Sequence, residues 1–152
     1  MTPAQQTALE ACARRALTQA DIDVLDPLLL PENRDDPAIA AHLSVGRTKI
    51  VPTQTGIGTI LAVMAPDGGD FLNNIETLGV TDSNCKWTLR LIEAGRLDLG
   101  NPVTRAQFLI FGMFHPEAAT PIAALLGVAE VADPINCTEL SDVQNALDAG
   151  EH

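Results

Sequence analysis

Residues 101–114 read NPVTRAQFLIFGMF and carry the clearest signals for the fold. Pro102 follows Asn101, and proline is favoured at the first position of a helix because the amide hydrogen that it lacks would have no partner there. The side-chain oxygen of Asn101 can accept hydrogen bonds from the free amides of the first turn. Apolar residues follow on nearly every side of the helix, a pattern typical of a central helix. The sequence therefore predicts a central helix over this stretch.

The same start signal recurs along the chain. Five further prolines follow a threonine or an aspartate, in the pairs Thr2-Pro3, Asp26-Pro27, Asp36-Pro37, Thr120-Pro121 and Asp133-Pro134. Glycines supply the complementary stop signals, at Gly46, Gly79, Gly95 and Gly127. Apolar residues recur at helical spacing between these marks. The sequence therefore predicts a mainly α protein, a compact single-domain bundle of about seven to nine short helices over residues 1–152, with residues 150–152 frayed.

The first of these helices is predicted to run from about residue 3 to residue 20. Thr2 and Gln5 have the spacing of a capping box, in which each side chain accepts a hydrogen bond from the backbone amide of the other residue. Leu9, Ala13 and Leu17 then recur at helical spacing and form its apolar side.

Residues 47–53, RTKIVPT, are the one convincing extended segment in the sequence. Residues with branched side chains alternate with polar ones there, as is typical of a strand. Pro52 cannot donate a backbone hydrogen bond, so this strand must lie at an edge or stand alone. We therefore expect at most one short extended segment, near residues 47–53.

The composition argues against several classes of partner. Nine lysines and arginines against twenty aspartates and glutamates give a formal net charge of −11, and Arg14-Arg15 is the only adjacent pair of basic residues. Nucleic acids and anionic membrane surfaces attract clustered positive charge, so neither is an expected partner. Three cysteines at irregular spacing argue against a secreted disulfide framework. The acidity fits either solubility or docking against a basic protein surface.

No pattern in the sequence carries catalytic or metal-binding chemistry. The three histidines form no H-E-x-x-H motif and have no cysteine at ligand spacing, and the acidic residues between 21 and 36 lack the spacing of a calcium loop. Gly56 and Gly58 could open an anion-binding helix or could let a neighbouring segment pack closely, and the surrounding residues match no complete nucleotide-binding motif. We therefore predict no enzyme activity, no cofactor, and no catalytic or metal-binding residue.

The candidates for a protein interface lie in two places. The extended segment contributes Arg47, Lys49, Ile50 and Val51, because the backbone of an exposed strand can pair with a strand of another chain. Trp87 is the only tryptophan of an aromatic-poor chain. It is the expected packing anchor, in the core or at an interface, because large aromatic side chains dominate interface energetics.

Several pieces of the chain resemble a known group of proteins. They are AIAA at 38–41, GRTKIVPT at 46–53, GIGTIL at 56–61, KWTLRLI at 86–92, NPVTR at 101–105 and DVQNAL at 142–147. These pieces resemble small, acidic, functionally uncharacterised proteins from the structural gene modules of tailed bacteriophages and prophages. The group carries no catalytic residue that could be transferred to this chain.

The resemblance implies a non-enzymatic virion structural or assembly protein in the tail, the neck or the capsid surface. Such a protein is located in the virion, is assembled in the host cytoplasm, and acts through contacts with other virion proteins and with copies of itself. The alternative is a small helical adaptor or regulator that binds a host or phage protein through an apolar groove.

Overall fold

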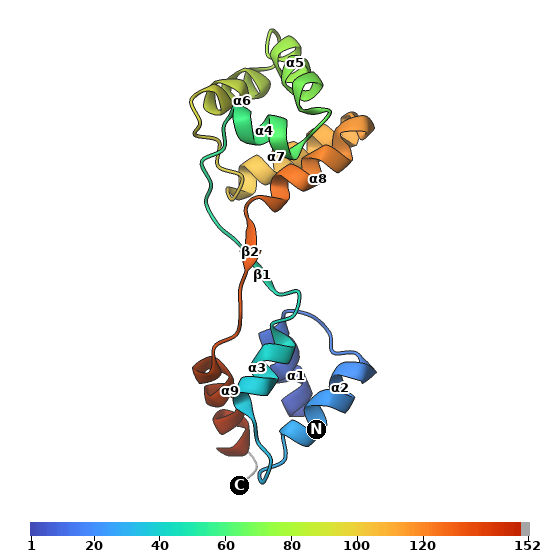
Figure 1. The fold of residues 1–152 in the computed structure, drawn as a ribbon, viewed down its shortest axis with the longest axis vertical. Coiled ribbons are helices and arrows are strands. Elements are labelled where there is room, and N and C mark those ends of the chain that lie inside the picture. The colour runs from blue at the N-terminus through green and yellow to red at the C-terminus, as the bar shows by residue number, and fades with distance from the viewer. Residues whose placement is uncertain (150–152) are drawn as a thin grey trace. The chain divides into compact units, whose positions relative to one another are not determined.

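The computed structural model of the protein describes residues 1–149 and is mainly helical (Figure 1). Within these residues the chain forms nine α-helices, two short 3-10 helices and two short strands. The prediction of a mainly α fold with seven to nine short helices is confirmed. The contacts of the chain cluster into two compact units. The sequence predicts a single domain over residues 1–152 and does not predict this division. The predicted fraying of residues 150–152 lies outside the described residues.

Unit 1 combines the two ends of the chain, Met1–Lys49 and the residues from Ala132 onward. Its elements are α1 (Pro3–Ala13), α2 (Gln19–Leu25), the 3-10 helix η1 (Asp26–Leu28), α3 (Asp36–Leu43) and α9 (Cys137–Ala149). Helix α9 packs against α1 and α3. The C-terminal helix thus completes a core whose fully buried side chains include Leu9, Leu25, Ile39, Leu43 and Leu140.

Capping boxes begin the first two helices. As predicted, the Gln5 amide donates to Thr2 Oγ1 at 3.2 Å and the Thr2 amide donates to Gln5 Oε1 at 2.8 Å. The predicted length of the first helix is wrong, because α1 ends just before Arg14, which has a left-handed φ of 56°. Thr18 then starts α2 in a second capping box with Asp21. This second start signal lies inside the stretch that the apolar spacing assigned to one helix.

The carboxylate of Asp21 is a polar centre of unit 1. Arg15 donates two hydrogen bonds to it at 2.7 and 3.0 Å, and Thr18 donates to it through both its amide and its hydroxyl. His42 Nε2 on α3 lies 2.8 Å from Asp21 Oδ1. The Arg15 guanidinium, followed by the Thr18 donors, holds the pKa of Asp21 well below its usual range. One ionised side chain thus links α2, α3 and the segment after α1.

Unit 2 is continuous and spans Ile50–Val131. Its helices are α4 (Ile57–Val63), α5 (Gly68–Leu78), α6 (Ser83–Glu93), α7 (Pro102–Phe114), the 3-10 helix η2 (Pro116–Ala118) and α8 (Ala119–Gly127). Helix α5 packs against α6, α7 packs against α8, and α4 contacts both α5 and α8. The fully buried side chains of this unit include Ile60, Met64, Ile92, Leu97, Leu99, Ile122 and Leu125.

Two short strands pair where the chain passes from one unit to the other. They are β1 (Thr48–Ile50) and β2 (Glu130–Ala132), so the predicted extended segment is confirmed. Beyond their ends, the Val51 amide donates to the Ala129 carbonyl and the Asp133 amide donates to the Arg47 carbonyl. This register is antiparallel, because residue numbers rise along one strand as they fall along the other. The prediction of at most one extended segment is wrong, since β2 is a second one.

Helix α7 begins where its sequence predicts. The prediction that it is a central, buried helix is wrong. Asn101 Oδ1 accepts hydrogen bonds from the amides of Val103 and Thr104 at 2.9 and 3.3 Å. Phe108 and Gly112 are buried, whereas five large apolar side chains are 52–79% exposed: Val103, Leu109, Ile110, Met113 and Phe114. The apolar pattern shows which positions avoid water, but it does not show whether the unit has enough neighbouring helices to cover them.

Candidate protein-binding groove

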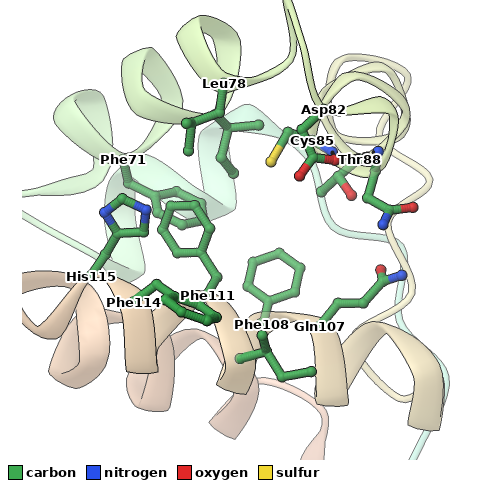
Figure 2. A pocket seen from close by; sticks show the side chains of 13 residues that line it. Phe71, Leu78, Asp82, Cys85, Thr88, Gln107, Phe108, Phe111, Phe114 and His115 are labelled. Atoms are coloured by element: carbon green, nitrogen blue, oxygen red, sulfur yellow. Dashed lines mark hydrogen bonds between the residues drawn. The ribbon is translucent and has the colours of Figure 1, made fainter.

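An apolar groove lies in unit 2 between α5, α6 and α7 (Figure 2). Its volume is about 380 Å³. All four phenylalanines of the chain line it, together with three aliphatic residues: Phe71, Phe108, Phe111, Phe114, Ile75, Leu78 and Ile110. Because the chain has no tyrosine and one tryptophan, this groove gathers most of its aromatic surface.

The aromatic rings at the base of the groove pack against one another. The ring centroid of Phe71 on α5 lies 5.9 Å from that of Phe108 and 5.8 Å from that of Phe111, and the second pair meets nearly at a right angle. The His115 ring stacks on Phe111 at a centroid distance of 4.4 Å. Tilted and edge contacts of this kind stabilise aromatic clusters beyond the effect of the area that they bury. Phe71 and Phe108 are buried, so they are held in place without a partner.

The polar residues of the groove lining are Asp82, Asn84, Thr88, Gln107 and His115, and the side chains of two of them take part in local contacts. Oδ1 of Asp82 accepts hydrogen bonds from the amides of Asn84 and Cys85 at 2.7 and 3.2 Å, which caps the start of α6. His115 Nδ1 lies 3.5 Å from the carboxylate of Glu117. Figure 2 shows Asp82 and Cys85 on the α6 side of the groove, across from the side chains of α7.

Cys85 supplies the one thiol in the groove lining. Burial raises the pKa of this thiol, and the negative charge of Asp82 raises it further. Nucleophilic cysteines are those whose pKa is lowered, because the thiolate is the attacking species. The surroundings of Cys85 therefore disfavour covalent catalysis by this residue.

The apolar surface continues from the groove onto the exposed side of α7. We call six exposed residues the α7 face: Val103, Ala106, Leu109, Ile110, Met113 and Phe114. Two of them, Ile110 and Phe114, also line the groove. Grouped exposed apolar side chains on this scale mark binding sites in soluble proteins.

Arg105 is the only charged side chain of α7, and it is engaged within unit 2. Its guanidinium donates to the carbonyls of Leu99 and Leu126 at 3.1 and 3.0 Å and to the Glu130 carboxylate at 2.8 Å. No acidic residue occurs between positions 99 and 116. The α7 face is therefore an uncharged surface on a strongly acidic chain.

Two of the residues predicted for an interface are paired within unit 1. Arg47 lies 3.2 Å from Asp133, Lys49 lies 3.7 Å from it and Arg14 lies 3.0 Å from it, so three cations surround one carboxylate. The side chain of Arg47 is only 9% exposed, which leaves little of it for a partner to contact.

The other three predicted residues belong to unit 2. Ile50 is exposed, while Val51 is half-buried and its amide already donates to Ala129. Trp87 on α6 is 58% exposed, with the guanidinium of Arg90 at 4.8 Å from its ring centroid, and it does not line the groove. The role of these residues in an interface stays a prediction.

The two glycines at the start of α4 differ in their surroundings. A Cβ atom on Gly56 would lie 3.3 Å from the Cα atom of Gly95, whereas one on Gly58 would meet no atom within 4 Å. The close-packing interpretation therefore holds for Gly56 and has no support at Gly58.

None of the predicted interface residues lines the groove, although the sequence carries a signal for its position. Three of the four phenylalanines, Phe108, Phe111 and Phe114, recur every three residues on α7. This spacing places them on neighbouring sides of one helix. The fourth, Phe71, comes from α5, and sequence alone does not show that these two helices meet.

Comparisons of the chain with protein-family models, with curated proteins and with solved structures found no match. Within residues 1–149, no three or more His, Cys, Asp or Glu side chains are arranged to hold a metal ion. In the same part of the chain, no helix combines the length and the apolar character needed to cross a membrane. The groove and the α7 face are the features on which a function can be built.

Proposed function

We propose that this protein is a non-enzymatic binding protein that docks a protein partner on the groove and the α7 face. One observation carries the proposal: five large exposed apolar side chains adjoin a groove lined by all four phenylalanines. Apolar surface in water is unfavourable by roughly 25 cal/mol per Å². A partner that covers this surface with its own apolar side chains therefore stabilises the complex.

The arrangement of the groove favours affinity, because part of it is already ordered. Phe71 and Phe108 are buried before a partner binds. Ordering rotamer-rich side chains on binding costs about 0.5–1.5 kcal/mol each, and rings that are already packed avoid much of that cost. The exposed ring of Phe114 at the end of α7 is then the natural anchor for a partner.

We place this binding in a tailed-phage particle or in its assembly, with other virion proteins and copies of the chain as partners. The sequence resemblance supports this setting, and the uncharged α7 face supports binding through apolar contacts. The alternative is a small helical adaptor or regulator of a host or phage protein. The groove itself favours that alternative, since apolar grooves commonly receive an amphipathic helix of a partner.

The test replaces one side chain in the binding surface. Ile110→Asp places a charge on both the groove and the α7 face, and Ile110 is half exposed, so the fold is retained. Val45→Asp introduces the same charge at an exposed valine of unit 1 and is the matched control. Burying an unpaired charge is strongly unfavourable, so we expect at least about a tenfold loss of incorporation into purified particles for Ile110→Asp.

Quantitative mass spectrometry of the particles gives the readout. Equal incorporation of Ile110→Asp and Val45→Asp would contradict the proposal. If the wild-type chain is absent from particles but crosslinks in cells to one protein in an Ile110-dependent way, the adaptor alternative replaces the virion role.

A further inference from the structure

The α7 face has the spacing of a seam between two helices. Val103, Ala106, Ile110 and Met113 are separated by three, four and three residues, and all four are exposed. This is the spacing with which one helix packs along another. Because α7 has 13 residues, the seam covers almost its full length.

The spacing of three, four and three residues is symmetrical, so it is the same from either end of the helix. When two α7 helices lie antiparallel across a twofold axis, Val103 of each copy faces Met113 of the other, and Ala106 faces Ile110. A small residue then meets a large one at the centre, so the two helices can approach closely. A twofold interface uses the same patch on both copies and must be self-complementary, a condition that these four positions meet.

Charge also favours this face for contact between copies. The chain has a formal net charge of −11, so two copies repel one another over most of their surfaces. Arg105 is the only Asp, Glu, Lys or Arg between positions 99 and 116, and it is bonded to Glu130 of its own chain. Two α7 faces can therefore meet without placing carboxylates opposite each other.

The exposed area is large enough for a weak dimer. Five side chains of the α7 face are more than half exposed, which amounts to on the order of 500 Å² per copy and about 1,000 Å² per pair. Specific interfaces begin at about that total area. Weak and transient contacts lie at this low end of interface size, so a dissociation constant on the order of micromolar is the one to test for.

We propose that the α7 face is covered by α7 of a second copy of this chain, in an antiparallel dimer with twofold symmetry. The inference rests on the proposed function and deepens it by naming the partner at this surface. Leu109 and Phe114 flank the seam, and Phe114 also lines the groove, so the groove lies directly beside the dimer contact.

Sedimentation velocity of the full chain between about 1 and 100 μM, a range set by micromolar affinity, tests the dimer. The wild-type protein and Val45→Asp should change from monomer to dimer across this range. Ile110→Asp should remain a monomer, with an unchanged circular dichroism spectrum. A wild-type protein that stays monomeric at the highest concentration would overturn the proposal.

A second pair of variants tests the antiparallel direction. Val103 and Met113 are exposed and ten residues apart, so charges placed there do not pair within one helix. The double variant Val103→Lys/Met113→Glu brings opposite charges together only in an antiparallel dimer, whereas Val103→Lys/Met113→Lys brings like charges together. The first should dimerise at least about tenfold more tightly than the second. Equal affinities, or a monomeric first variant, would overturn the arrangement.

The two levels of the proposal can fail separately. If the wild-type chain is monomeric but Ile110→Asp still loses incorporation into particles, the dimer is refuted and the protein-binding function stands. If Ile110→Asp changes neither dimer formation nor incorporation, both are refuted.

Discussion

Gln144 on α9 offers a quantitative test of the packing in unit 1. Its side chain is 4% exposed, and neither Oε1 nor Nε2 has a hydrogen-bond partner among residues 1–149. A buried polar group without a partner costs about 1–3 kcal/mol, because it has lost its contacts with water. Methionine has a similar length and no amide, so it removes the unsatisfied atoms without opening a cavity. We expect Gln144→Met to raise the free energy of unfolding by about 1–3 kcal/mol.

Urea unfolding followed by far-UV circular dichroism measures this change. Asn145→Met is the matched control, since residue 145 is the next position of α9 and is exposed. Surface substitutions of this kind change stability by about 0.5 kcal/mol or less. An unfolding midpoint of Gln144→Met equal to or below that of the wild type would refute the reasoning, because it would mean that the amide is satisfied in solution.

Three further substitutions test the polar and steric contacts that position the helices. Asp21→Asn should lower the free energy of unfolding at pH 7 and make it depend less on pH in acid. Arg15 lowers the pKa of Asp21 in the folded protein, so the ionised carboxylate stabilises the wild type above the unfolded pKa of about 4, and this stabilisation is lost as the pH falls. Urea midpoints from pH 7 to pH 3 measure the difference. Asn101→Ala should cost about 1 kcal/mol through the lost cap of α7, measured by the same unfolding experiment. Gly100→Ala should lower the melting temperature sharply, because the added Cβ atom would overlap backbone atoms of the neighbouring segment. A Cβ atom on Gly58 would meet no described atom within 4 Å, so Gly58→Ala should leave stability unchanged or raise it by up to about 1 kcal/mol. Equal melting temperatures for the two glycine variants would contradict this reasoning.

Local signals predicted the helix starts well. The capping box of Thr2 and Gln5 and the cap at Asn101 form as expected, because each depends on residues within one turn of one another. The end of α1 at Arg14 was missed, since a non-glycine residue takes the left-handed conformation there. Strand β2 was missed because it is three residues long, and its pairing with β1 joins segments about eighty residues apart.

The candidate site was harder to predict, because it depends on which helices meet. The apolar pattern of residues 101–114 predicted a helix correctly, but the burial of its side chains depends on how many neighbouring helices surround α7. The rings of Phe71 on α5 and Phe111 on α7 pack against each other, although about forty residues of sequence separate them. Arg47 and Lys49, two of the predicted interface residues, pair with Asp133, and this contact between distant segments is one that no local pattern shows.

Two methionines of unit 2 allow a direct test of whether the α7 face is a protein-binding surface. Met113 lies on this face and is 78% exposed, whereas Met64 is 1% exposed in the core of the same unit. Hydroxyl-radical footprinting with mass spectrometry compares the oxidation of both side chains in dilute free protein and in the assembled state, because exposed methionines oxidise faster than buried ones. If the α7 face binds a protein, oxidation of Met113 should fall several-fold on assembly while Met64 reacts slowly in both states. Oxidation of Met113 at the same rate in free and assembled protein would contradict it.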